Sequence, residues 1–160
     1  MDYKNSLKNT AFYKTQIGLI KICSFKNSII EIRFASEKED VSLSSPTKLS
    51  DIAIKQINEY LDGKRKTFDL PIKLLGTAFQ KSVWEALQKV KYGDKSTYKD
   101  IAIAIGNPKA CRAVGMANNK NPIAIVVPCH RVVGSNGKLV GYAGGLEIKE
   151  KLLNIEKSNS

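Results

Sequence analysis

Hydrophobic and polar positions in the N-terminal 35 residues follow the pattern of antiparallel strands. An apolar run at 17–23 leads into the polar turn 26–28. The return segment, 29–34, is rich in β-branched residues, which favour extended backbone. The pattern predicts a small antiparallel sheet within residues 11–35.

A helical period replaces this pattern farther along the chain. Apolar residues recur every three or four positions across 48–61, which is the spacing of an amphipathic helix, and Gly63 marks its end. The intervening segment, 36–47, is polar and is predicted to be a loop. Residues 67–70 are predicted to form a last short strand before Pro71.

The composition shifts at residues 71–76, where neither a helix nor a strand is indicated. Thr77, with Gln80 three residues later, completes a capping box that starts a helix. We therefore place a domain boundary here. The prediction is an N-terminal domain at 1–73 and a C-terminal domain at 74–160.

Two short helices are predicted in the C-terminal domain. Thr97 is a good N-cap with Asp100 in the first turn, and Gly106 ends the first helix. Asn107 is expected to cap the second helix, with Pro108 at its first position. Helices joined by so tight a turn resemble a helix-turn-helix, although an ordinary helical hairpin has the same pattern.

The charge of the chain favours a polyanionic partner. Lys and Arg number 26 against 15 Asp and Glu, a formal net charge of +11. Nucleic acid is the first candidate and an anionic membrane surface the second, although a solvated lysine-rich surface is the plain alternative. The second predicted helix would expose Lys109, Arg112 and Asn119, and such a helix can lie in a groove of DNA.

Composition restricts the class of protein further. The 160 residues suffice for one compact domain or two small ones, and 42% of them are hydrophobic. No apolar run approaches the ~20 residues that span a bilayer, and residues 1–10 lack the apolar core of a signal peptide. Three cysteines without CxxC spacing favour the reducing cytoplasm over a disulfide framework. With a single histidine, the chain is expected to bind no structural zinc.

The candidate chemistry is concentrated at 128–133. An apolar run, 123–127, is expected to form a short buried strand that places Cys129 at its end, directly before the only histidine, His130. A thiolate is a strong nucleophile, and a neighbouring imidazole is the usual means of forming one near neutral pH. Adjacent strand residues point to opposite faces, so the pair can cooperate only if the chain bends after Cys129 or if a water links them. A buried structural cysteine beside an unrelated histidine is the alternative.

These residues resemble one family closely, the O6-alkylguanine-DNA alkyltransferases of direct-reversal DNA repair. The resemblance extends from Gly76 to Glu156, whereas the N-terminal half matches only in layout and size. The Pro-Cys-His-Arg-Val core and the Gly-Gly-Leu that follows it are its most specific parts. The matching positions are 76–80, Tyr98, 106–110, 112–115, 121–122, 128–133, Tyr142, 144–146 and Glu156.

The resemblance implies both a fold and a reaction. The fold would be α/β (α+β), with a small ribonuclease-H-like N-terminal domain before a mainly helical domain that contains the helix-turn-helix. Cys129 would take the alkyl group from O6 of guanine, and less well from O4 of thymine, in one irreversible turnover. His130 would act as base through a bridging water, and Glu156 would fix the imidazole tautomer. The damaged base would be flipped out of the duplex.

Further residues acquire roles from the same resemblance. Asn121 would brace the turn around the active-site segment, and Arg112 would fill the space that the flipped base leaves. Tyr98 would serve N3 of the base and its 3′ phosphate. The base or the DNA would be contacted by Tyr142, the carbonyls of Cys129 and Val132, the amide of Ala143, and Lys149. Asn118 stands where some relatives have a bulkier apolar residue near the arginine, so the wedge would be weaker.

The expected partner is double-stranded DNA containing O6-alkylguanine, bound by a cytoplasmic monomer without a cofactor or a membrane. Whether molecules cluster along DNA stays open. Two other functions remain compatible with the residues: a DNA-binding regulator whose cysteine does not react, and a cysteine hydrolase. The hydrolase would need a base within direct reach of the sulfur and an oxyanion hole, and no oxyanion motif is recognisable. Cys23 and Cys111 are expected to be packing residues.

Overall fold

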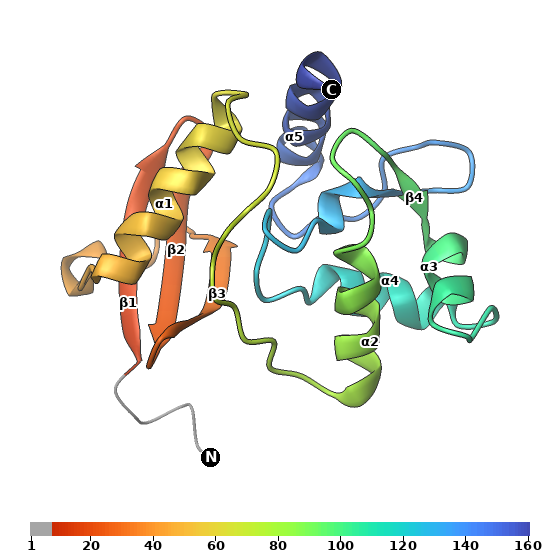
Figure 1. The fold of residues 1–160 in the computed structure, drawn as a ribbon, viewed down its shortest axis with the longest axis horizontal. Helices are drawn as coiled ribbons and strands as arrows, with labels where there is room; N and C mark the ends of the chain where they lie inside the picture. Colours follow the sequence, from red (N-terminus) through yellow and green to blue (C-terminus); the bar gives the residue numbers. More distant parts are fainter. Residues whose placement is uncertain (1–7) are drawn as a thin grey trace.

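The computed structural model describes residues 8–160 and places a sheet-based N-terminal part beside a helical C-terminal part (Figure 1). Residues 1–7, within the polar segment examined for a signal peptide, lie outside this range. An antiparallel sheet has the order β1-β2-β3, formed by β1 (Asn9–Thr15), β2 (Gly18–Phe25) and β3 (Ser28–Phe34). A short 3₁₀ turn, η1 (Val41–Leu43), precedes α1 (Lys48–Leu61), which covers one face of the sheet.

α1 has the bounds that its apolar period predicts. Thr47 and Ser50 form a reciprocal capping box at its start, which satisfies two backbone N–H groups that the helix leaves free. Ala53, Ile57 and Tyr60 form its buried face. The first two pack in the core, and Tyr60 also reaches the C-terminal part, as described below.

The C-terminal part is mainly helical and contains one short pair of strands. Its elements are α2 (Ala78–Leu87), β4 (Ser96–Thr97), α3 (Tyr98–Ala104), α4 (Cys111–Asn119), η2 (Cys129–Arg131), β5 (Val132–Val133) and α5 (Leu146–Asn159). β4 and β5 pair in parallel, which fixes the segment after η2 beside the start of α3. A small sheet followed by helices confirms the predicted α/β (α+β) class.

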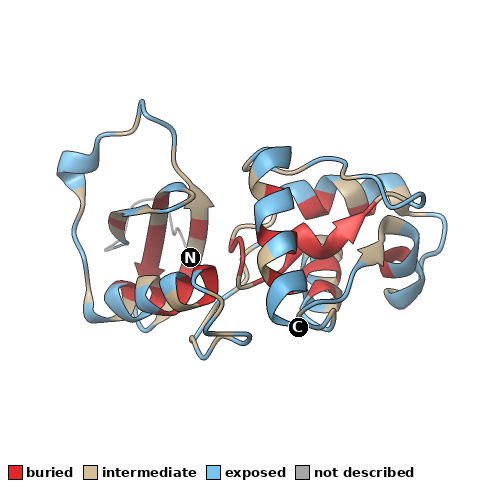
Figure 2. Ribbon diagram, turned by 90° about the horizontal axis from the view of Figure 1, so that it is seen from above, coloured by how far each residue is buried: buried red, intermediate tan, exposed pale blue. Residues whose placement is uncertain are grey.

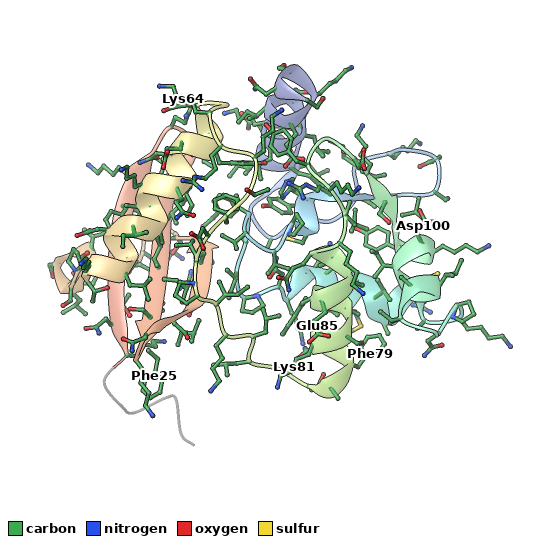
Figure 3. All side chains as sticks on the ribbon, viewed as in Figure 1. Phe25, Lys64, Phe79, Lys81, Glu85 and Asp100 are labelled. Carbon is green, nitrogen blue, oxygen red and sulfur yellow. The ribbon has the colours of Figure 1, made fainter. Side chains whose placement is uncertain are left out.

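The predicted N-caps of α2 and α3 are confirmed. Thr77 caps α2 with Gln80, and Thr97 caps α3 with Asp100, each pair forming a capping box. Figure 3 shows Asp100 at the β4 end of α3, where a carboxylate favours the positive end of the helix dipole. α3 ends just before Gly106, whose φ of 78° lies in the left-handed region that glycine tolerates.

α4 begins later than the sequence predicts. Asn107 does not cap it and Pro108 is not its first residue, because α4 starts at Cys111 and has no side-chain cap. The N–H of Ala110 bonds the carbonyl of Asn107 at 3.0 Å, so residues 107–110 form a separate turn. A local Asn-Pro signal fits a turn as well as it fits a helix start.

Residues 67–70 do not form the predicted strand. Pairing occurs slightly later, where Ile72 makes a single parallel bridge with Ile29 of β3. The buried side-chain amide of Gln56 instead bonds both backbone groups of Asp69, at 3.0 and 2.9 Å. A side chain of α1 thus replaces the neighbouring strand that this segment would need.

The apolar run 123–127 is a buried turn, so the predicted strand there is wrong. Ile123 makes one bridge with Ile32 of β3, and the chain then reverses through Ile125, whose φ is 71°. The N–H of Val127 bonds the carbonyl of Ile123 at 3.0 Å. An unbroken apolar run indicates burial but does not separate a strand from a compact turn.

One hydrophobic cluster joins the two parts of the molecule. It contains Ile20 and Ile57 from the N-terminal part and Trp84, Val114 and Leu152 from the C-terminal part. Figure 2 shows buried residues on the facing sides of both parts. Because the core is shared, the domain division at residues 73 and 74 stays a prediction. Within residues 8–160, none of the helices has the length and apolar character needed to cross a membrane.

Candidate active site

Cys129 begins the 3₁₀ turn η2 and borders a small cavity. The chain therefore bends directly after the cysteine, which is one of the two arrangements that the sequence allows. The cavity has a volume of about 110 Å³, and its walls include Phe34, Asn118, Tyr142 and Gly144. This is less than the ~300–1,000 Å³ of common small-molecule sites, so the site is narrow in this conformation.

The thiol of Cys129 is protonated in this environment. Burial raises its pKa to about 11, although a hydrogen bond from Asn121 and the charge of Lys149 oppose the increase. The sequence alone favours a ready-made thiolate, and the structure corrects that expectation. The sulfur must lose its proton during the reaction rather than before it.

His130 is fully buried and paired with Glu156. Its Nε2 lies 2.6 Å from Oε2 of Glu156, which assigns the proton to Nε2. The other ring nitrogen, Nδ1, is buried and makes no hydrogen bond within the described residues. Burial lowers the pKa of His130, while the hydrogen bond to Glu156 acts in the opposite direction. A neutral imidazole with a free Nδ1 is the form that can accept a proton.

Glu156 is the most heavily hydrogen-bonded side chain of the site. It accepts from Arg131 at 2.8 and 3.1 Å, from the backbone N–H of Gly93 at 3.1 Å and from the hydroxyl of Tyr60 at 2.5 Å. Burial alone would raise its pKa, but hydrogen bonds from His130 and Arg131 outweigh burial and lower it to about 2. A carboxylate near the C-terminal end of α5 needs such compensation because the helix dipole opposes it.

Asn121 and Lys149 brace the segments on either side of Cys129. The amide of Asn121 donates to the carbonyl of Val127 at 2.7 Å and accepts from the N–H of Ile123 at 3.0 Å. Lys149 is buried, and its Nζ donates to the carbonyls of Val140 and Gly141 at 2.9 and 3.3 Å. Lys149 therefore holds the loop before α5 in this conformation, rather than presenting its charge to DNA as the resemblance implies.

The residues expected to surround the base lie around the same loop. Tyr142 and Ala143 line the cavity, and the Tyr142 hydroxyl is buried without a hydrogen bond in the described residues. Tyr98, at the start of α3, donates to the carbonyl of Val140 at 2.9 Å. Val132 is buried in β5 opposite Ser96. These four residues belong to three separate stretches of sequence.

The exposed face of α4 carries the expected polar side chains. Arg112 and Asn119 are exposed on the helix, and Lys109 is exposed in the turn before it. Met116 follows Arg112 by one helical turn and is 64% exposed. Within residues 8–160, no group of three or more His, Cys, Asp or Glu side chains is arranged to hold a metal ion.

Comparison with known proteins decides the family. The model for the DNA-binding domain of 6-O-methylguanine DNA methyltransferase matches residues 78–158, and the model for its ribonuclease-like domain matches residues 9–74. The chain belongs to the O6-methylguanine DNA methyltransferase family. The resemblance identified from the sequence is thus confirmed over both halves, including the N-terminal half that matched only in layout.

Individual relatives cover nearly the whole methyltransferase chain. A methylated-DNA–protein-cysteine methyltransferase of Methanosarcina barkeri is 46% identical over 150 residues, which is 91% of this chain and 95% of that protein. The constitutive enzyme of Bacillus subtilis is 44% identical over 152 residues, 90% and 92% of the two chains. The crystal structure of Mycobacterium tuberculosis OGT in complex with DNA has a TM-score of 0.87, 39% identity, and 95% and 94% coverage. The activity is therefore transfer of a methyl group from DNA to a cysteine of the protein, a direct-reversal DNA repair.

Several contacts of the methyltransferase site have no recognisable signal in the sequence. Arg131 belongs to the motif at 128–133, but the motif does not predict its carboxylate partner, Glu156. Tyr60 and Phe34 lie in the N-terminal half and look like ordinary apolar positions. Asn118 is 2% exposed, lines the cavity and donates to the carbonyl of Cys129 at 3.4 Å. The side chain of Asn118 therefore lies in the site, and its expected effect on the wedge stays a prediction.

Proposed function

We propose that Cys129 is the cysteine that accepts the alkyl group. The observation that carries this assignment is that Cys129 borders the cavity and directly precedes His130, which is buried and hydrogen-bonded to Glu156. Cys23 is buried in the sheet, where its sulfur contacts Thr10 at 3.4 Å. Cys111 lies at the start of α4, and its sulfur is 3.9 Å from the carbonyl of Pro108.

The reaction is an in-line displacement at the alkyl carbon. The sulfur of Cys129 forms a bond to that carbon while the bond from carbon to O6 of guanine breaks, and guanine leaves as an anion. The thiol proton passes to Nδ1 of His130 through a water, and Glu156 stays ionised and balances the imidazolium. The thioether product is stable, so each molecule acts once.

The damaged base enters the site after it has been flipped out of the duplex. Arg112 fills the vacated space in the stack, where a guanidinium can both stack and donate hydrogen bonds. The carbonyls of Cys129 and Val132 read the exocyclic amine of guanine. Hydrogen-bond donors aimed at O6 and N3 of the leaving guanine stabilise the negative charge that develops on it. One of these donors is the backbone amide of Ala143, and the others are tyrosine hydroxyl groups. Tyr142 and Tyr98 supply the hydroxyl groups.

The proposed substrate is double-stranded DNA containing O6-alkylguanine, with O4-alkylthymine as a poorer substrate. The net charge of +11 and the exposed face of α4 support DNA as the partner. We further propose that the protein acts as a monomer in the cytoplasm. Three free cysteines are compatible with that reducing compartment.

A matched pair of variants on α5 tests the acid–base assignment. Glu156→Gln removes the charge beside His130, whereas Glu150→Gln changes an exposed residue of the same helix. Single-turnover transfer from an O6-methylguanine duplex should slow by about a hundredfold or more in Glu156→Gln, because an uncompensated buried imidazolium is costly. Glu150→Gln should react at the wild-type rate.

The thermal midpoint of each variant shows whether the fold is kept. A folded Glu156→Gln protein that transfers the methyl group at the wild-type rate would show that the His130–Glu156 pair does not serve the reaction. Transfer that persists after Cys129→Ala would show that the acceptor is another cysteine.

A further inference from the structure

Tyr60 reaches from α1 of the N-terminal part into the buried pair of the active site. Its side chain is 0% exposed, and its hydroxyl donates to Oε2 of Glu156 at 2.5 Å. The same oxygen lies 3.2 Å from Nε2 of His130. The Tyr60 hydroxyl therefore contacts both members of the pair.

Aromatic neighbours hold the Tyr60 ring in one place. Its centroid lies 5.6 Å from that of Phe68, 6.0 Å from that of Tyr92 and 6.3 Å from that of His130, the last two in edge-on geometry. Such edge-on packing is favourable for aromatic rings and restricts the side chain to one rotamer. The hydroxyl is thereby aimed at the carboxylate before any substrate arrives.

The charges around the pair make this hydroxyl a donor. Burial raises the pKa of Tyr60, so its proton stays on oxygen and is available to the ionised carboxylate. Oε2 of Glu156 then accepts from Tyr60, His130 and Arg131 together. An acceptor shared among three donors binds each of them less strongly than an acceptor with two. The titratable and charged groups that act on the pair are Tyr60 on α1, Tyr92 after α2, Arg131 on η2 and Lys149 on α5.

We infer that Tyr60 is a positioning residue of alkyl transfer, through which the N-terminal part orients the His130–Glu156 pair toward Cys129. This inference rests on the proposed roles of those three residues. Tyr60 does not touch the reacting atoms. It fixes the carboxylate oxygen that holds Nε2–H of His130, and so it fixes the direction in which Nδ1 points. The N-terminal part thus completes the active site as well as the core.

Tyr60→Phe tests this inference, with Tyr92→Phe as the matched control. Both changes remove one hydroxyl and keep a ring in the same aromatic group, but the Tyr92 hydroxyl contacts the carbonyl of Ile155 at 3.5 Å rather than the pair. Single-turnover transfer from an O6-methylguanine duplex should slow by about tenfold in Tyr60→Phe, the usual effect of losing a hydrogen bond to a charged group. Tyr92→Phe should react at the wild-type rate.

The pKa of His130, measured from the NMR signals of its ring nitrogens, gives a second readout. It would not change in Tyr60→Phe if Tyr60 served only the packing of the core. The chain has one histidine, so its NMR signals need no assignment among several. With one donor fewer on Glu156, the remaining bond to Nε2–H strengthens, so the pKa of His130 should rise in Tyr60→Phe and stay unchanged in Tyr92→Phe. In the wild-type protein, the Nε2–H proton and the Tyr60 hydroxyl proton should exchange slowly and lie close together, a measurement that needs no variant.

Two results would overturn the inference. One is a Tyr60→Phe protein with the wild-type rate and His130 titration, and the other is a slowed variant whose His130 titration is unchanged. A third variant separates failure of this inference from failure of the proposed function. If His130 had no role in the reaction, His130→Gln would transfer the methyl group at the wild-type rate, whatever the rate of Tyr60→Phe.

Discussion

At the scale of single residues, the reactivity of Cys129 depends on a proton that the resting site does not release. Burial raises the pKa of the thiol to about 11, and the neighbouring His130 is kept neutral by its own burial. A buried neutral pair costs less than a buried ion pair. In the proposed mechanism, the thiolate forms only when a substrate carbon is in place to receive the sulfur, which would protect a protein that can react once from unrelated electrophiles.

This account predicts slow modification of Cys129 by iodoacetamide at pH 7. A pKa of about 11 lies above pH 7, so the thiol is protonated there and becomes a thiolate only as the pH rises toward 11. Compared with an ordinary cysteine of pKa 9.0, the rate at pH 7 should be about a hundredfold lower. Peptide masses after timed exposure measure the rate for Cys129 separately from that for Cys111. Rapid carboxymethylation of Cys129 at pH 7, as fast as in the denatured chain, would contradict the account.

The sequence predicts the reacting residues that we propose, but not those that support them. Cys129 and His130 are adjacent in an unusual motif, and Glu156 follows from the family resemblance. Tyr60 is 96 residues from Glu156 in sequence, and its position in the apolar stripe of α1 predicts packing only. A contact of that separation depends on how the N-terminal part packs against the C-terminal part, which no local sequence pattern predicts.

At the scale of elements, the cavity wall is formed where β3 meets the loop before α5. Phe34 at the end of β3 packs edge-on against Tyr142, with ring centroids 6.0 Å apart. Gly144 lies so close that a Cβ added there would be 2.6 Å from the Phe34 ring. Glycine is therefore required at 144 for close approach rather than for its backbone angles.

Gly144→Ala is predicted to displace this loop and slow alkyl transfer. The added methyl group collides with the Phe34 ring, so either the ring or the loop must move, which alters the wall that faces Cys129. We expect single-turnover transfer to fall by about tenfold and stability to fall by about 1–3 kcal/mol, the range for overpacking. Urea denaturation and transfer kinetics measure the two effects.

Gly115→Ala serves as the reference for stability. A Cβ there would meet Tyr98 at 3.8 Å, an ordinary contact, and the residue lies within α4. Its free energy of unfolding should rise by about 0.5–1 kcal/mol because alanine favours helix. If Gly144→Ala were stabilised to the same degree, the close packing of this loop against β3 would be wrong.

Local rules predict the helices better than the buried turns. The capping box of α2, the N-cap of α3 and the apolar period of α1 each determine an element over a few residues, and all three form as predicted. The run 123–127 fails because its apolar side chains are equally buried in a turn that bridges β3. The strand predicted at 67–70 does not form, because the side chain of Gln56 on α1 takes the backbone hydrogen bonds of Asp69.

At the scale of the whole molecule, the excess of positive charge favours binding to DNA of any base sequence. A protein that must find rare lesions benefits from contacts to phosphates, which every stretch of DNA presents. The proposed contact is the exposed face of α4, which carries Arg112, together with Lys109 in the turn before it. The exposed Lys64 lies on the N-terminal part near the end of α1 (Figure 3).

Affinity for undamaged duplex is predicted to fall steeply with salt. If binding neutralises even two phosphates, raising the salt concentration from about 50 to about 200 mM lowers the affinity about tenfold. Each further phosphate contact makes the affinity fall more steeply with salt. Lys109→Ala should weaken binding and reduce the salt slope by about 1, because one phosphate contact is lost. Fluorescence anisotropy with labelled duplex measures both. The control Lys64→Ala should keep the wild-type slope, and an equal change in both variants would contradict α4 as the contact.

The most direct test of the account is the mass of each cysteine-containing peptide after reaction with an excess of duplex containing O6-methylguanine. The account predicts one methyl group per protein molecule, carried by the Cys129 peptide, with an equal amount of guanine restored and no further turnover. A methyl group on Cys23 or Cys111, repair that exceeds one event per molecule, or repair by a protein whose Cys129 stays unmodified would contradict it.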